Sequence, residues 1–168
     1  LGSKEKKLIK EQKIPSGHNP DDYIVERVDS KSHDGRFVPL TITRHKNTKL
    51  DGTAHLLLYG YGSYGSSMSP SFSTTRLSLI NRDIIWVTAH IRGGMEKGMK
   101  WWKEGKLMNK KNTFEDYIYA AKYLIEKQYS SKGKIIGMGG SAGGLLMGAV
   151  VNKAPNLFLG IIMAVPFV

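Results

Sequence analysis

The chain has 168 residues, of which 40% are hydrophobic and 23% charged, a composition typical of one ordinary globular domain. It contains no cysteine, which excludes disulfides, thiolate metal sites and cysteine nucleophiles and fits a reducing compartment. The net charge is +11, but the lysines are scattered apart from a modest cluster at Lys4, Lys6, Lys7, Lys10 and Lys13. We expect a solvated segment there rather than a nucleic-acid-binding arm.

The N-terminal part predicts a connector followed by a hairpin. Residues 1–20 are polar and end in turn-forming Pro, Gly and Asn residues, which is typical of a connector. Residues 23–28 and 37–43 each predict a strand. Between them, residues 32–35 form a hairpin-type turn, so we expect the two strands to be antiparallel.

The rest of the chain alternates strands with helices. Strands are predicted at 55–59, 83–89, 134–138 and 159–165, and helices at 71–80, 113–127 and 142–152. Thr113 is placed as the N-cap of the longest helix, with Asp116 three residues further on. This alternation predicts an α/β protein with a mainly parallel sheet and helices on both faces.

A short motif near the end points to nucleophilic chemistry. Gly139-Gly140-Ser141-Ala142-Gly143 matches the G-x-S-x-G elbow, between a predicted strand and a predicted helix. A serine on so sharp a turn exposes its hydroxyl at the carboxyl edge of the sheet, and the helix N-terminus favours a developing oxyanion there. Residues 137–142 also match a loose dinucleotide pattern, but no Asp or Glu follows Glu126 to bind the ribose.

The loop after the third predicted strand is the second candidate part of this site. Residues 59–65 read Tyr-Gly-Tyr-Gly-Ser-Tyr-Gly. In α/β hydrolases this loop supplies the second oxyanion donor, and a tyrosine hydroxyl can donate in place of a backbone N–H. Tyrosines in a turn are also common packing groups, so that alternative stays open.

Several segments, taken in order, resemble the peptidase domain of the prolyl oligopeptidase family. They are residues 56–65, 91–94, 112–114 and 139–146, and the ending 165–168 is more similar to the oligopeptidase B branch. The resemblance implies a partial α/β-hydrolase fold that lacks its last strands. It implies that residues 1–20 are a connector from an absent β-propeller and that residues 21–168 are the N-terminal portion of the peptidase domain.

The same resemblance implies the site and its substrate. Ser141 would be the nucleophile, the Tyr61 hydroxyl and the Ala142 backbone N–H would form the oxyanion hole, and Tyr64 would bind substrate. Short peptides would be cleaved after Arg or Lys, in the cytoplasm, through an acyl-enzyme. The implied partners are peptides, the missing C-terminal part of the peptidase domain and the propeller, with no cofactor, metal, nucleic acid or membrane.

The general base is the part that the sequence does not supply. An α/β hydrolase presents serine, acid and histidine in that order, but no Asp, Glu or His follows Ser141. We therefore expect the chain to be inactive alone. His90 and Asp116 would give an order that belongs to other folds. An inactive split or degenerate fragment and a basic binding module stay open as alternatives. The apolar run 157–168 is too short to span a bilayer, and we expect its strand to expose an apolar edge.

Overall fold

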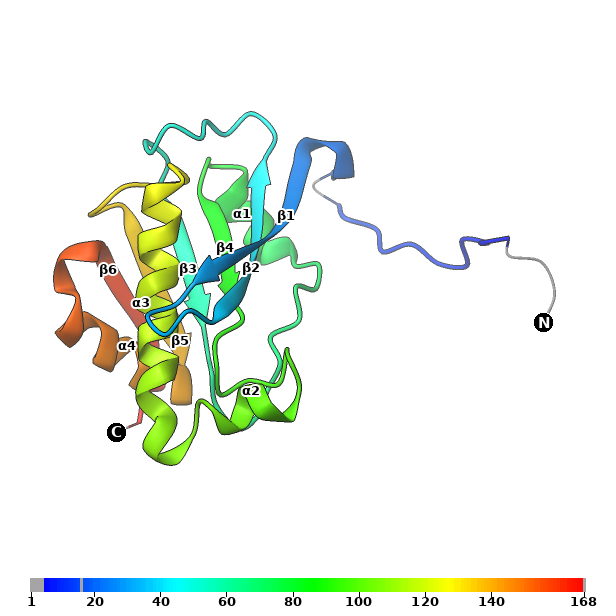
Figure 1. Cartoon of the computed structure of the whole chain (residues 1–168). Coiled ribbons are helices and arrows are strands. Elements are labelled where there is room, and N and C mark those ends of the chain that lie inside the picture. Colours follow the sequence, from blue (N-terminus) through cyan, green and yellow to red (C-terminus); the bar gives the residue numbers. More distant parts are fainter. Residues whose placement is uncertain (1–4, 16, 168) are drawn as a thin grey trace.

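A six-stranded sheet organises the computed structural model, which describes residues 5–15 and 17–167. Residues 1–4, 16 and 168, which fall within the predicted segments 1–20 and 21–168, lie outside the described residues. Residues 5–15 form neither helix nor strand and run away from the sheet (Figure 1). Their lysines are exposed, as expected for a solvated segment.

The sheet joins an antiparallel hairpin to a parallel part. Its strands are β1 (Tyr23–Lys31), β2 (Phe37–His45), β3 (Leu56–Gly60), β4 (Ile85–Ala89), β5 (Ile135–Gly140) and β6 (Phe158–Ala164). They lie in the spatial order β1-β2-β4-β3-β5-β6. β2 pairs with β1 and β4 in antiparallel fashion, and the pairs β4-β3, β3-β5 and β5-β6 are parallel. The predicted α/β architecture is confirmed.

Helices cover both faces of this sheet. They are α1 (Thr74–Ile80), α2 (Met99–Lys103), α3 (Lys110–Glu126) and α4 (Ala142–Lys153), with short 3₁₀ turns η1 (Pro20–Asp22), η2 (Leu107–Asn109) and η3 (Pro155–Leu157). α3 and α4 lie side by side on one face, where Figure 1 shows α3 crossing in front of the strands. Within residues 5–15 and 17–167, each helix is too short or too polar to act as a membrane span.

The alternation of side chains along the strands divides the apolar residues between two cores. In β3, Leu56 and Leu58 pack into the larger core with α3 and α4. Leu57 points the other way and joins Ile80 of α1 and Trp86 of β4. Because both faces of β3 and β4 are buried, these strands read as nearly continuous apolar runs.

Helix α3 begins at Lys110, so the prediction that Thr113 is its N-cap was wrong. The residue before the helix, Asn109, makes no side-chain capping bond. Thr113 is fully buried, and its hydroxyl donates to the carbonyl oxygens of Arg92 (2.8 Å) and Gly105 (3.1 Å). Tertiary partners therefore take the hydroxyl that would otherwise have capped the helix.

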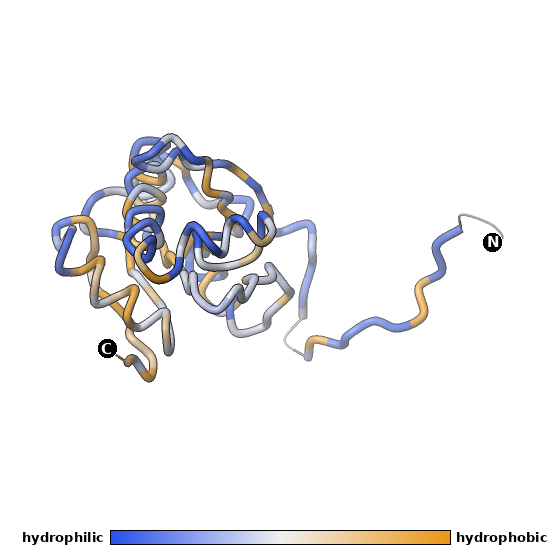
Figure 2. The backbone as a smooth tube through the Cα atoms, turned by 60° about the horizontal axis from the view of Figure 1, so that its bottom comes forward, coloured by the Kyte–Doolittle hydropathy of each residue, from blue (hydrophilic) through white to orange (hydrophobic). Residues whose placement is uncertain are grey.

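Strand β6 lies at one edge of the sheet and exposes apolar side chains, as expected. Leu159 is 56% exposed and Met163 47% exposed. The segment that follows is also apolar, with Val165 at 81% exposure. Figure 2 shows this C-terminal stretch in orange, whereas the extended N-terminal segment is mostly blue. Exposed apolar strand edges of this kind favour self-association.

Candidate active site

Ser141 occupies a strained bend between β5 and α4. Its φ of 54° and ψ of −117° place a non-glycine residue in a sparsely populated region. Two bonds hold the bend, because the Ser141 N–H donates to the Ala164 carbonyl (2.8 Å) and the Ser141 carbonyl accepts from the Gly144 N–H (2.8 Å). The residue is exposed and its hydroxyl does not cap α4. The hydroxyl is therefore presented to solvent at the carboxyl end of β5.

The glycines around Ser141 are required by close packing. A Cβ atom on Gly139 would lie 2.3 Å from the Gly143 carbonyl oxygen, and one on Gly143 would lie 2.9 Å from the Gly60 carbonyl oxygen. Both distances are far below van der Waals contact, and both neighbours are backbone. The end of β3, the end of β5 and the first turn of α4 therefore meet where only glycine fits.

This packing brings Tyr61 and Ala142 to the same place. The Cβ position of Gly143 lies 3.4 Å from Cδ2 of Tyr61, so the tyrosine ring rests against the first turn of α4. Ala142 is the first residue of that helix, and its N–H has no partner inside the helix. The positive end of the helix dipole also lies here. The arrangement suits a nucleophilic hydroxyl that generates negative charge on a nearby oxygen.

Tyr64 lies on the same loop and lines a cavity beside Ala142. It is 71% exposed and has a φ of 56°. The cavity has a volume of about 360 Å³, and its walls include Tyr64, Trp102, Lys106, Lys110, Ala142 and Phe167. In the part of the chain that the structure describes, no carboxylate lines it.

A buried ion-pair network supports residues 59–65, the tyrosine loop. The sequence did not indicate this role. Arg92 is 1% exposed. Its guanidinium donates to Asp116 through Nε (2.8 Å) and Nη2 (2.6 Å), and it also pairs with Asp34. Burial acts to lower the pKa of Arg92, but the two carboxylates raise it above its ordinary value. The next residue, Gly93, accepts a 2.9 Å bond from the Gly65 N–H, so the network fixes the segment on which the loop rests.

The other candidate triad members do not reach Ser141. His90 is buried, with Nε2 lying 2.8 Å from the Thr41 hydroxyl and Nδ1 3.6 Å from a Glu96 carboxylate oxygen. Asp116 is bound by Arg92 and Ser32, as the only hydrogen-bond partners that the described residues give its side chain. The structure therefore places both residues in structural networks.

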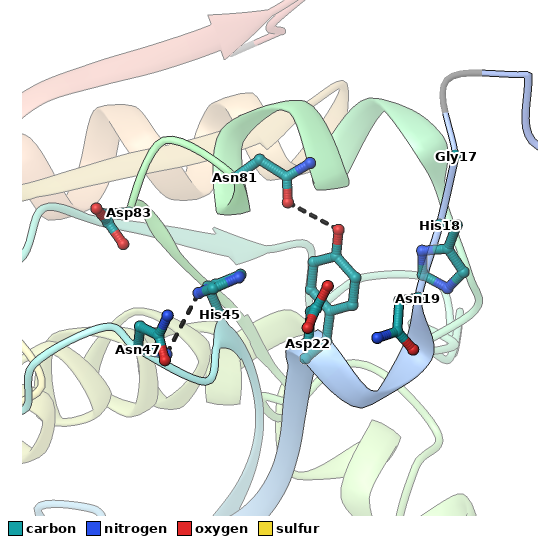
Figure 3. Close-up of a pocket in the computed structure, with 9 residues that line it drawn as sticks. Gly17, His18, Asn19, Asp22, His45, Asn47, Asn81 and Asp83 are labelled. Carbon is teal, nitrogen blue, oxygen red and sulfur yellow. Dashed lines mark hydrogen bonds between the residues drawn. The ribbon is translucent and has the colours of Figure 1, made fainter.

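A separate polar hollow of about 660 Å³ (Figure 3) lies away from Ser141. Its polar groups pair with one another, because the Tyr23 hydroxyl donates to Asn81 (2.8 Å) and the Asn47 N–H donates to His45 (3.3 Å). Asp83 lines the hollow and lies just before β4, whereas Ser141 directly follows β5. Because β4 and β5 run in the same direction, the hollow and Ser141 lie at opposite ends of these strands. Among the described residues, no three His, Asp or Glu side chains gather closely enough to hold a metal ion.

Comparisons with known proteins give one consistent family. The model of the prolyl oligopeptidase family matches residues 70–168. Dipeptidyl aminopeptidase BI of Pseudoxanthomonas mexicana is 47% identical over 165 residues, which cover 98% of this chain and 23% of that protein. Protease 2 of Moraxella lacunata is 44% identical over 168 residues, which cover 100% of this chain and 24% of that protein.

A solved structure extends the similarity to the fold. Oligopeptidase B from Trypanosoma brucei, in a closed form with covalently bound antipain, superposes with a TM-score of 0.93 at 38% identity. The match covers 98% of this chain and 23% of the trypanosomal chain. The chain thus spans about a quarter of the length of the relatives it matches.

Proposed function

Because the chain belongs to the prolyl oligopeptidase family, we propose that it carries the nucleophile of a serine oligopeptidase, and that this nucleophile is Ser141. The observation that carries the proposal is the exposed, strained Ser141 between β5 and α4, where the Tyr61 ring rests against the first turn of α4. In this proposal residues 21–168 are the N-terminal portion of the peptidase domain. Residues 1–20 are the connector to a β-propeller.

The proposed reaction proceeds through an acyl-enzyme. The Ser141 oxygen attacks the carbonyl carbon of a peptide bond while its proton passes to a histidine base. The carbonyl oxygen becomes an oxyanion, which accepts hydrogen bonds from the Ala142 N–H and the Tyr61 hydroxyl. The C–N bond then breaks as the base protonates the leaving amine. Water, activated by the same base, hydrolyses the ester and returns Ser141 to its starting form.

The base and its acid come, in this proposal, from outside the 168 residues. No Asp, Glu or His follows Ser141, and the upstream candidates His90 and Asp116 are held in other networks. Without a base the hydroxyl keeps its proton and is a weak nucleophile. The isolated chain is therefore inactive in this account, and it acts when joined to the rest of a peptidase domain.

The proposed substrates are short peptides cleaved after Arg or Lys, in the cytoplasm. This specificity rests on the similarity to oligopeptidase B. Tyr64 and Trp102 give the cavity beside Ala142 aromatic walls, but no carboxylate of the described residues lines it. In this proposal the groups that bind a basic side chain come from residues outside this chain. The reaction consists of acyl and proton transfers, so it needs no cofactor.

A chimera tests the proposal directly. The chain replaces the matching segment of dipeptidyl aminopeptidase BI, to which 98% of it aligns at 47% identity. A fluorophosphonate probe should label the chimera at Ser141 and should label the isolated chain poorly. Ser141→Ala should abolish labelling, whereas Ser78→Ala, a change at an exposed serine on α1, should not.

Two results would contradict the proposal in different ways. A chimera that folds but is not labelled at Ser141 would remove the nucleophile. Equal labelling of the isolated chain and the chimera would show that the base is not missing, and would refute the argument for inactivity.

A further inference from the structure

Lys110 places a positive charge where the fold does not favour one. It is the first residue of α3, at the positive end of the helix dipole. Its side chain is partly buried, and this desolvation lowers the pKa of Lys110 to about 8. Among the described residues no carboxylate pairs with it. Partial burial without a carboxylate partner, at the positive end of a helix, is unfavourable for a charge, so its hydrogen bonds must explain its presence.

The ammonium makes two short bonds to the tyrosine loop. Lys110 Nζ donates to the Gly62 carbonyl oxygen (2.6 Å) and to the Ser63 hydroxyl (2.8 Å). Gly62 directly follows Tyr61, and Ser63 directly precedes Tyr64. Lys110 therefore holds the backbone between the two tyrosines that the proposed function places around the substrate.

Three residues on one face of α3 hold successive points of the chain from β3 into this loop. The Tyr117 hydroxyl donates to the Leu58 carbonyl inside β3. One helical turn earlier, the Thr113 methyl group lies 2.4 Å from where a Cβ of Gly62 would be, so it fills the space that this glycine leaves. Lys110, three residues before Thr113, completes the series. Of the three, only Lys110 binds the loop through hydrogen bonds.

We propose that Lys110 is a positioning residue. Its ammonium fixes the loop backbone between Tyr61 and Tyr64 and thereby holds the Tyr61 hydroxyl where the oxyanion forms. The effect of Lys110 on catalysis rests on the proposed function, whereas its contact with the loop rests on the two hydrogen bonds alone. Besides Lys110, the ionisable side chains that line the same cavity are Lys106 and Tyr64, and neither of them bonds to Gly62 or Ser63 among the described contacts.

The contact is tested in the 168-residue chain by carbon-13 NMR of labelled glycine. The Gly62 carbonyl signal should shift as the pH passes through about 8, since its donor changes from an ammonium to an amine. The shift should be absent in Lys110→Met and kept in Lys111→Met, a matched change at the next, exposed lysine. Because Lys110→Met removes an unfavourable charge, it should fold at least as well as the unsubstituted chain.

The catalytic effect is tested in the chimera, with kcat expressed per site titrated by fluorophosphonate. Lys110→Met should lower kcat at least tenfold with KM changed less than twofold, because a displaced oxyanion donor weakens transition-state binding. Complete removal of one such donor lowers kcat by about 10²–10³-fold. Lys110→Arg, which restores a cationic donor, should recover part of the loss, and Lys111→Met should lose nothing. A purely structural role would reduce the number of titrated sites and leave kcat per site unchanged.

The outcomes separate the two proposals. An unchanged kcat per site in Lys110→Met, or the same Gly62 titration with and without Lys110, overturns the positioning role. A chimera that is never labelled at Ser141 refutes the proposed function instead, while the Gly62 titration still decides whether Lys110 binds the loop.

Discussion

Replacing Gly139 by alanine should damage the site far more than the same change at its neighbour Gly140. A Cβ on Gly139 would lie 2.3 Å from the Gly143 carbonyl oxygen and 2.7 Å from its carbon. Relieving this clash requires β5 and α4 to separate by about 1 Å, and the obstacle is backbone that cannot rotate away. Overpacking usually costs about 1–3 kcal/mol, so we expect a loss near the upper end, about 3 kcal/mol.

The control position undergoes the same substitution with a much milder contact. A Cβ on Gly140 would first meet the Ala164 carbonyl oxygen at 3.3 Å, so Gly140→Ala should change the free energy of unfolding by less than about 1 kcal/mol. Urea unfolding of the chain, followed by circular dichroism, measures both variants. Fluorophosphonate labelling of the chimera should be lost only in Gly139→Ala. Equal costs at the two positions would refute the argument that close packing at Gly139 shapes the elbow.

Four further predictions follow from the same geometry. Tyr61→Phe in the chimera should lower kcat by about 10²–10³ with little change in KM, and equal kinetics would remove the tyrosine from the oxyanion site. Arg92→Met should destabilise the chain by about 3–5 kcal/mol in urea unfolding, because Asp116 is left buried and charged, and adding Asp116→Leu should recover part of that loss. Leu159→Lys should reduce the concentration-dependent association of the isolated chain in sedimentation experiments, since the residue is exposed on an edge strand. For Lys110 the pKa is about 8 in the folded state against 10.5 ordinarily, so the unfolded state binds more protons between these pH values; the free energy of unfolding should rise across that window, and less so in Lys110→Met.

The elbow could be predicted from the sequence because its signals are local. Gly139 is required by its contact with the first turn of the helix that directly follows β5, whereas Gly143 also packs against the end of β3. The same holds for β3 and β4, whose buried faces give apolar runs that are visible without a structure. The contact of Gly139 and these apolar runs need no knowledge of which strands are neighbours.

Features that depend on distant partners could not be predicted. Threonine is a common N-cap residue, but the Thr113 hydroxyl donates to the carbonyl oxygens of Arg92 and Gly105. The three residues before it are polar, so no apolar periodicity marks the true start of the helix. Lys110 is one of these polar residues. Its contact with Gly62 joins positions far apart in the sequence, and only the folded chain brings them together.

The spatial order of the strands in the sheet could likewise not be predicted from the sequence. β4 lies between β2 and β3, although β2 and β3 are consecutive in the chain, because β2 pairs with β4 in antiparallel fashion. This insertion puts the segment after β4, with Arg92, beside the tyrosine loop after β3. The support of the loop is therefore a product of topology.

A crystal structure of the chimera with a fluorophosphonate adduct on Ser141 is the most direct test of the oxyanion site. If Ala142 and Tyr61 form this site, the phosphonyl oxygen lies about 2.7–3.1 Å from both the Ala142 nitrogen and the Tyr61 hydroxyl oxygen. An adduct whose oxygen points to solvent, or a Tyr61 hydroxyl that lies beyond hydrogen-bond distance from it, would contradict the account.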